Sequence, residues 1–376
     1  MVLMSSHLKS ILMRINSTWV GSIVLVAIIG ISLWGCKKEQ NVVPETPNSN
    51  GTNNGINQGP NDSSKTNGPT PYQVKIPVGF PALSAHPENP LTVEGIALGR
   101  KLYYDPLLSQ GGPLSGMSCS GCHDQKTSFT VSGGPVAILP HVNLAWNSKF
   151  LWNGKIEGRL EDIMAFEVDD FFKSDMKVLA ASSEYQKLYN NAFGSTEINS
   201  RRTAFALAQF FTTLISGNSK FDLYLQKRRT FTNLERVGYD LFNSETGDCF
   251  HCHGYPLMTD NAFHNIGLDS TFSGPNLGRY LISQVESDKG AFKSPTLRNI
   301  ALTAPYMHDN RFNTLEEVVE HYDSGVKKSA SLDPLLKKGN RVNGLKLSSF
   351  QKEALVAYLK TLTDTEFISN PELAKP

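Results

Sequence analysis

The chain has 376 residues, enough for two globular domains and additional segments. Its 36 basic and 35 acidic residues leave a formal net charge of +1, which argues against a nucleic acid or an acidic polymer as partner. Length and charge do not indicate which chemistry the protein performs, whereas motifs along the chain do.

The first 36 residues are expected to be a targeting segment. Lys9 and Arg14 form a positively charged start, and the apolar run from Trp19 to Trp34 is about long enough for a signal peptide but short for a membrane span. The run ends in a bacterial lipoprotein-like box with Cys36 as the lipidated residue, although Trp34 is bulky for its position there. An uncleaved membrane anchor is the alternative. Both predict a body on the periplasmic or cell-envelope side of a bacterial membrane.

Residues 37–72 are rich in Asn, Gly, Pro, Ser and Thr and contain almost no large apolar side chains. Such a segment cannot bury enough surface to offset the entropy lost on ordering. We therefore predict a disordered linker that holds the folded body away from the membrane.

A first domain is predicted over residues 73–225. Thr92 is the expected N-cap of a helix whose apolar residues run from Val93 to Tyr103, and Asp105-Pro106 marks its end. A loop rich in Gly, Ser and Pro then leads to Cys119, Cys122 and His123. Two cysteines three apart with a histidine directly after form the attachment signature of c-type haem: two thioethers hold the porphyrin and the imidazole reaches the iron.

A second domain is predicted over residues 226–366, with 367–376 as a tail. An amphipathic helix from Leu234 to Phe242 leads to a second copy of the signature at Cys249, Cys252 and His253. A zinc ribbon would place its two CxxC pairs closer together and would not need a histidine after each. With Cys36 assigned to lipid, all five cysteines are used and none is left for a disulfide.

Other histidines and a methionine of the second domain are candidate ligands. Met307 lies on a polar loop after a proline, where a core methionine is not expected, and a His253/Met307 pair would close both axial positions of the second haem. His308 is the alternative ligand. His251 is interpreted as a polar filler within the motif, and His264 as a structural residue or a contact to a haem propionate.

Helices are also expected from Thr314, and from Ser348 to Leu362 at the end of the second domain. No strand-rich region is found. The predicted fold is mainly α: two cytochrome c-like haem domains packed together, preceded by a signal peptide and a disordered linker.

These motifs together resemble those of the bacterial di-haem cytochrome c peroxidases, a family that includes the methylamine-utilisation di-haem enzyme. The likeness covers about residues 77–365. The stretches that carry it are Leu98–Pro106, Ser118–Asp124, Val142–Trp146, Leu151–Lys155, Ala204–Leu225, Phe263–Leu268 and Lys293–Asp309.

The resemblance implies a division of labour between the haems. The haem at His123 would be peroxidatic, the haem at His253 and Met307 would transfer electrons, and Trp152 would relay electrons between them. Family members place a glutamate about twenty residues after this tryptophan as the distal acid/base, and an ungapped alignment puts Lys173 there. Lysine has no acceptor for the peroxide proton.

Four residues are candidates for the missing distal group. Glu167, Asp169 and Asp170 could serve if the backbone is shifted by a turn, and each is otherwise a solvated charge. His141 lies in a loop shorter than in many relatives, and it is a candidate sixth ligand of the first haem, a candidate distal base or a surface residue.

The implied function is reduction of hydrogen peroxide to water by electrons from a small cytochrome c or cupredoxin. One alternative is a di-haem electron carrier or redox sensor whose first haem is permanently six-coordinate. The other is oxidation of a partner protein or organic molecule, as in the methylamine-utilisation branch; that branch replaces the axial methionine by tyrosine, so Met307 argues against it. Relatives are commonly homodimers. Many hold calcium between the domains, for which this chain offers the carbonyls of Lys293 and Pro295 but no matching first-domain asparagine.

Overall fold

The computed structural model describes residues 68–84, 86–133, 136–338 and 344–376. The predicted signal segment, Cys36 and residues 37–67 of the predicted linker lie outside the described residues. All described residues belong to one unit, Ser63–Pro376. Among them no helix is long and apolar enough to cross a membrane.

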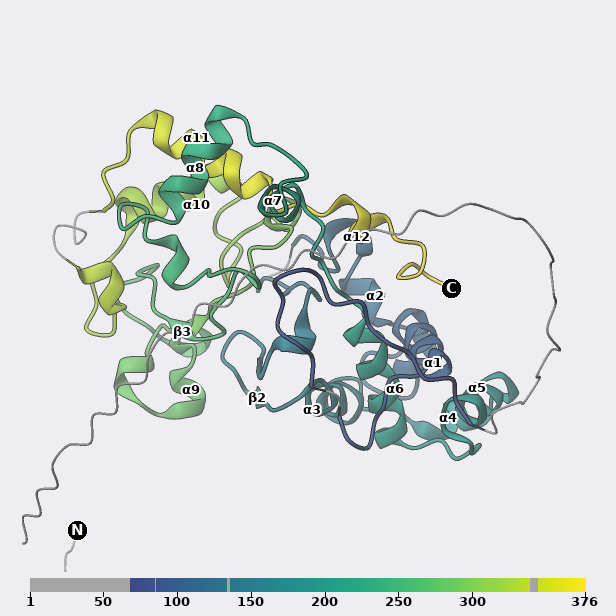
Figure 1. Cartoon of the computed structure of the whole chain (residues 1–376). Helices are drawn as coiled ribbons and strands as arrows, with labels where there is room; N and C mark the ends of the chain where they lie inside the picture. The colour runs from purple at the N-terminus through teal and green to yellow at the C-terminus, as the bar shows by residue number, and fades with distance from the viewer. Residues whose placement is uncertain (1–67, 85, 134–135, 339–343) are drawn as a thin grey trace, which may run out of the picture. The chain divides into compact units, whose positions relative to one another are not determined.

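The described chain is mainly helical, as predicted, and its helices form two groups (Figure 1). The first group contains α1 (Val93–Tyr104), α2 (Cys119–Cys122), α3 (Leu160–Phe166), α4 (Met176–Ala180), α5 (Ser183–Phe193) and α6 (Ser200–Thr212). The second contains α7 (Lys220–Leu225), α8 (Asn233–Phe242), α9 (Tyr280–Ser283), α10 (Leu315–Glu320) and α11 (Ser349–Lys360), and α12 (Thr365–Ser369) follows it. Two antiparallel strand pairs complete the described elements: β1 (Lys149–Phe150) with β2 (Ile156–Glu157), and β3 (Phe263–His264) with β4 (Phe292–Lys293).

Both groups are built on a crossed pair of helices that meet at a glycine. A Cβ on Gly99 of α1 would overlap the backbone of Ala206 in α6, and a Cβ on Gly238 of α8 would overlap the backbone of Ala354 in α11. Only a residue without a side chain allows the two backbones to approach this closely. The second of these pairs joins α8 to the helix expected from Ser348 to Leu362.

Helix α1 begins where the sequence predicted. Thr92 Oγ1 accepts the Gly95 N–H at 3.0 Å, and Leu98, Leu102 and Tyr103 are fully buried in the core of the first group. The segment before it, assigned to the end of the linker, is attached to this helix: the Thr70 N–H donates to Glu94 Oε2 at 2.7 Å. The folded body therefore includes residues ahead of the predicted boundary at residue 73.

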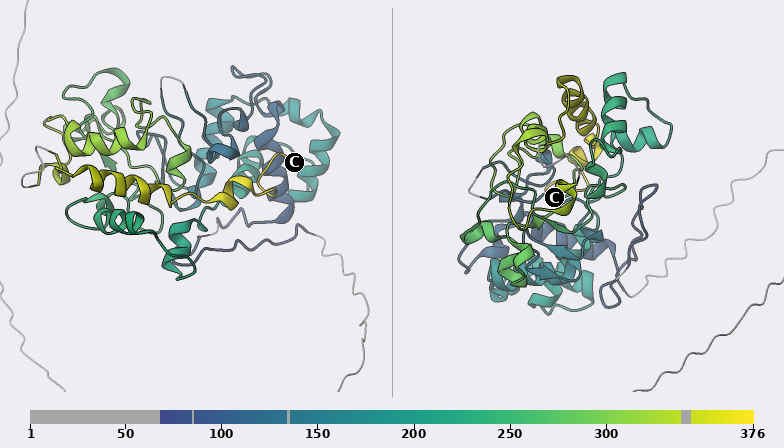
Figure 2. Two further views of the ribbon diagram at one scale, coloured as in Figure 1. Left: turned by 90° about the horizontal axis from the view of Figure 1, so that it is seen from above. Right: turned by 90° about the vertical axis from the view of Figure 1, so that its left-hand side faces the viewer.

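The C-terminal segment returns to the first group of helices (Figure 2, left). Phe367 and Leu373, in the predicted tail 367–376, are buried in the first core, and Arg100 Nε donates to the Ala374 carbonyl at 2.6 Å. The Phe367 ring packs 5.3 Å from that of Phe129, measured between centroids. The last residues of the chain thus complete the first domain, not the second.

Replacing Phe367 with alanine should therefore destabilise the first domain. A buried phenylalanine truncated to alanine costs about 3–5 kcal/mol of unfolding free energy, which urea denaturation would measure. Phe350, which is 56% exposed on α11, provides the matched control, and its replacement should change stability by less than about 0.5 kcal/mol. Equal effects of the two substitutions would contradict the packing role of the C-terminal segment.

Candidate functional site

The first CxxCH motif forms a short helix with a buried imidazole at its end. Cys119 and Cys122 are the first and last residues of α2, and His123 follows as its C-cap. The His123 Nδ1–H donates to the Phe129 carbonyl at 2.8 Å, which leaves Nε2 for a metal. Burial lowers the pKa of His123 to about 4, so the imidazole is neutral, as ligation requires.

His141 lies against this imidazole. The His123 and His141 rings are stacked with centroids 3.5 Å apart, and His141 Nδ1 is 3.2 Å from the Tyr103 hydroxyl. The two stacked rings stand side by side and do not face each other across a gap. This position does not favour its prediction as a sixth ligand or distal base, and contacts to Tyr103 and Phe211 show that it is not a surface residue.

Among the acidic candidates the structure distinguishes Glu167. It begins a π-helical turn, Glu167–Phe171, that directly continues α3, and such turns are often found at functional sites. Burial raises the pKa of Glu167 to about 7, and its carboxylate, after burial, raises the pKa of the Cys119 thiol. Glu167 therefore lies within electrostatic range of the first haem-attachment motif.

The charged residues that follow Glu167 are exposed to solvent. Asp169 and Asp170 are exposed on the same turn, and so is Lys173, which an ungapped alignment places at the family glutamate. Of these charged residues only Glu167 has a pKa raised by burial, which makes it the strongest of the acidic candidates for the distal group.

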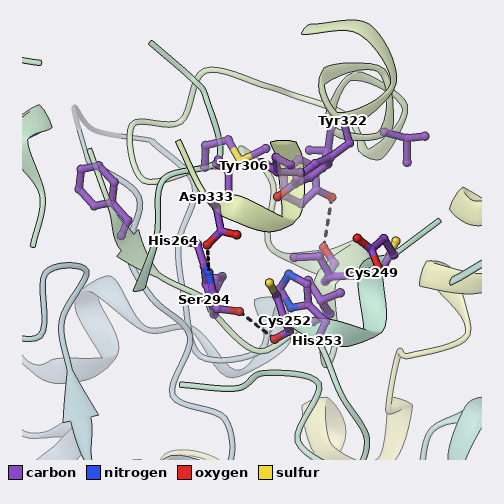
Figure 3. Close-up of a pocket in the computed structure, with 18 of the residues that line it drawn as sticks. Cys249, Cys252, His253, His264, Ser294, Tyr306, Tyr322 and Asp333 are labelled. Carbon is purple, nitrogen blue, oxygen red and sulfur yellow. Dashed lines mark hydrogen bonds and ion pairs between the residues drawn. The ribbon is translucent and has the colours of Figure 1, made fainter. Parts of the chain in front are cut away.

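The second CxxCH motif opens into a large apolar cavity (Figure 3). The His253 Nδ1–H donates to the Met258 carbonyl at 3.1 Å, so Nε2 is again left for a metal. Met307 lines the same cavity as His253, Cys249 and Cys252. Cysteine, imidazole and thioether groups around an apolar space fit a covalently attached haem with a His/Met ligand pair. Apolar and aromatic side chains that line the space include Phe242, Leu268, Phe292, Leu315, Val319, Tyr322, Leu355 and Leu359.

The loop that carries Met307 has a constrained backbone. Met307 and Asn310 have φ angles of 69° and 58°, in the left-handed region. Asparagine tolerates this conformation better than most residues other than glycine. Arg311 holds the loop by donating through Nε to Asp309 Oδ2 at 2.9 Å and through Nη2 to Asp269 Oδ2 at 2.7 Å.

His264 is saturated by two carboxylates at the rim of the cavity (Figure 3). Its Nδ1 is 2.7 Å from Asp333 Oδ2 and its Nε2 is 2.8 Å from Asp260 Oδ2. Hydrogen bonds from both nitrogens outweigh burial and raise the pKa of His264 to about 12, so the ring is an imidazolium. Both donors are used, which favours the predicted structural role over a propionate contact.

His308 and His251 are both engaged with other side chains, which does not favour either of them as an iron ligand. His308 also lines the cavity, but its ring is stacked on Phe292 with centroids 3.6 Å apart and its Nε2 is 3.3 Å from Asn276 Oδ1. His251, within the motif, is paired with Asp248 at 2.6 Å. Met307 remains the better candidate for the sixth ligand of the second haem.

Trp152 joins the two halves of the site. It lines the cavity of the second motif, and its indole Nε1–H donates at 2.7 Å to the carbonyl of Ala137, in the loop that follows the first motif. The Ala137 N–H in turn donates to the His308 carbonyl at 2.9 Å, directly after Met307. The indole therefore stands between the loop of the first motif and the ligand loop of the second.

The structure gives little support for a calcium-binding site at Lys293 and Pro295. Among the described residues, the His, Cys, Asp and Glu side chains close enough together to hold a metal are Cys252/Asp260/His264 and Glu245/Asp248/His251. Lys293, one of the two predicted carbonyl donors, also brings a buried ammonium to the same strand. A second cation beside an ammonium in a low-dielectric site is unfavourable.

Sequence reasoning missed the side chain of Lys293. This residue was considered for its carbonyl only, yet it is 5% exposed and lines the second cavity. The signal was present, because a lysine between Phe292 and Ser294 on a short buried strand is unusual.

The chain is similar to known proteins of one family. Residues 93–230 match the model of a family described as di-haem cytochrome c peroxidase. The methylamine utilization protein MauG of Methylorubrum extorquens is 34% identical over 309 residues, 77% of this chain and 84% of that protein. The cytochrome c551 peroxidase of Nitrosomonas europaea is 31% identical over 258 residues, 64% of this chain and 75% of that protein.

A solved structure is also similar along most of its length. It is a MauG-like protein associated with microbial copper homeostasis, with a TM-score of 0.72 and 31% identity over 81% of this chain and 99% of that chain. The di-haem peroxidase BthA from Burkholderia thailandensis, at 19% identity and a TM-score of 0.56, shares the fold.

Proposed function

Because this chain belongs to the di-haem cytochrome c peroxidase family and carries that family's two covalently bound c-type haems, we propose that it reduces hydrogen peroxide to water. The electrons would come from a small periplasmic cytochrome c or cupredoxin. The observation that carries this proposal is Glu167, a carboxyl group with a pKa of about 7 beside the first haem motif. An electron carrier has no use for an acid/base group in that position.

The two haem-attachment motifs would have different roles. The haems supply redox-active iron, and the protein decides which one meets peroxide. At the second motif, His253 and Met307 would occupy both axial positions, which suits electron transfer. At the first motif, His123 would hold the iron, and His141, stacked beside it, would leave a further position at that iron for the oxidant.

Glu167 would move the protons. As a carboxylate it takes the proton from the peroxide oxygen that binds, and as a carboxylic acid it returns that proton to the leaving oxygen. A pKa near 7 makes both forms available at neutral pH.

Trp152 would carry electrons between the two haems. It lines the second cavity and bonds to Ala137 in the loop after the first motif. The complete reaction consumes two electrons and two protons per hydrogen peroxide and yields two waters. Export through residues 1–36 and a lipid on Cys36, outside the described residues, would place this reaction on the periplasmic side of the membrane.

The test uses the purified holoprotein, reduced so that only the haem of higher potential holds an electron. Addition of hydrogen peroxide and a reduced small cytochrome should oxidise two cytochrome molecules per peroxide, and cyanide should bind rapidly to the first haem. No oxidation of any donor, together with no cyanide binding, would contradict the proposal and favour an electron carrier or redox sensor.

Oxidation of a partner protein is the second candidate function. Two relatives, at 34% and 31% identity, are methylamine utilization proteins MauG. Met307 in the second cavity argues against it, because the thioether raises the potential of the ferric/ferrous couple and so disfavours storing oxidising equivalents there. Accumulation of a stable oxidised state on both haems after peroxide, without consumption of a cytochrome donor, would favour this candidate.

A further inference from the structure

Strand β4 brings a buried ammonium group to the second cavity. Lys293 is 5% exposed and lines the cavity beside Trp152 and Ser294. Its Nζ donates to Asn261 Oδ1 at 2.7 Å, a neutral amide oxygen. Burial lowers the pKa of Lys293 to about 8 because Asp260 opposes the desolvation only partly.

The nearby carboxylates are committed to other partners. Asp333 Oδ2 and Asp260 Oδ2 both bond to His264, and the remaining oxygen of Asp260 accepts the Ala262 N–H at 2.9 Å. No ion pair to Lys293 occurs within the described part of the chain. An ammonium removed from water without a bonded anion costs several kcal/mol. No carboxylate of the described residues bonds directly to this ammonium, so an anion carried by the occupant of the cavity can take that place.

We propose that Lys293 Nζ binds a propionate carboxylate of the second haem, and that its charge raises the reduction potential of that haem. A c-type haem held at Cys249 and Cys252 brings two carboxylates into an otherwise apolar space. An ammonium–carboxylate hydrogen bond is charge-assisted and is about twice as strong as a neutral one. The inference depends on the proposed function only in assigning electron transfer to this haem.

The same residue also fixes the predicted relay. The backbone N–H of Lys293 donates to the Trp152 carbonyl at 2.8 Å. An unpaired ammonium here would disfavour a positive charge on the indole, whereas an ammonium bonded to a propionate leaves the surroundings of Trp152 close to neutral. Lys293 is thus a positioning residue that connects the haem edge to the tryptophan.

The experiment compares Lys293→Met and Lys293→Arg with a control, Lys289→Met, in the holoprotein. Lys289 lies on the surface, where its Nζ pairs with Glu286 at 2.8 Å. The readouts are the midpoint potential of the low-spin haem, from a redox titration without peroxide, and the propionate-bending mode in the resonance Raman spectrum. Neither requires turnover, so failure here is distinct from failure of the peroxidase proposal.

We expect Lys293→Met to shift the oxidised-to-reduced equilibrium about tenfold toward the ferric haem, which is about 59 mV lower in potential for one electron, and to shift the propionate mode. Lys289→Met should change neither. If Lys293→Met does not load the haem, Lys293→Arg decides: it keeps the charge and should retain the haem and its potential.

Three results would overturn the inference. One is an unchanged potential in Lys293→Met. Another is a lower potential with an unchanged propionate mode, which would mean that Lys293 only balances Asp260. The last is loss of the haem in both Lys293 variants, which would mean that the side chain is needed for its shape and not for its charge.

Discussion

Replacing Glu167 with glutamine is expected to lower peroxidase turnover by about 10²- to 10⁴-fold, the usual contribution of a general acid–base group. Glutamine preserves the shape of the side chain in the π-helical turn but can neither accept nor return a proton. Donor oxidation at a fixed peroxide concentration measures the effect, and the absorption spectrum checks that both haems are present. Asp170→Asn, an exposed carboxylate on the same turn, is the matched control.

The pKa of Glu167 also predicts how kcat/KM for peroxide depends on pH. The base form of Glu167 is needed to accept the peroxide proton, and burial raises its pKa to about 7. The kcat/KM for peroxide should therefore rise as pH increases through about 7 and then level, and this inflection should vanish in Glu167→Gln. An inflection that persists in the variant would assign the acid–base role to another group.

The contribution of Glu167 to the free energy of unfolding should change in the opposite direction and fall as pH rises. The pKa of Glu167 is higher in the folded chain than in the unfolded chain, whose value is near 4.5, so the folded state holds more protons between these two values. Its contribution to stability is therefore lost as pH rises from about 4.5 to 7. Above pH 7, Glu167→Gln should be at least as stable as the original protein, which makes a loss of turnover through unfolding easy to recognise.

The second large effect is expected for Arg298→Met, which should cost about 3–5 kcal/mol of unfolding free energy. Arg298 is fully buried, and its Nη1 and Nη2 donate to the two oxygens of Asp222 at 2.9 and 3.0 Å. Its Nε donates to the Pro256 carbonyl at 2.8 Å, in the loop after the second haem motif. Methionine fills similar space but leaves a buried carboxylate and a buried carbonyl without these donors.

Chemical denaturation with haem absorbance as probe would measure this loss. The double variant Asp222→Leu/Arg298→Met should recover part of it, because no unpaired buried charge remains, although Asp222 also accepts from the Ser219 backbone at 2.9 Å. A loss below about 1 kcal/mol in the single variant would show that water or a rearranged side chain satisfies Asp222. Arg236→Met, at an exposed pair with Asp240, should have no measurable effect.

The cofactor class could be predicted from the sequence alone. Covalent attachment of a c-type haem needs two cysteines and a histidine within five consecutive residues, so Cys119–His123 and Cys249–His253 could be recognised without any fold. The family matches confirm two covalently bound haems, and the mainly helical prediction is also confirmed. The N-cap at Thr92 followed from local chemistry in the same way.

Only the tertiary structure decided which polar groups meet. Glu167, Asp169 and Asp170 are equivalent in sequence, and the π-helical turn alone distinguishes the buried carboxylate from the two exposed ones. His264 owes its charge to Asp260, four positions away, and to Asp333, 69 positions away. The predicted tail packs into the first core through Phe367 for the same reason: burial and pairing depend on contacts between distant segments, which local pattern does not encode.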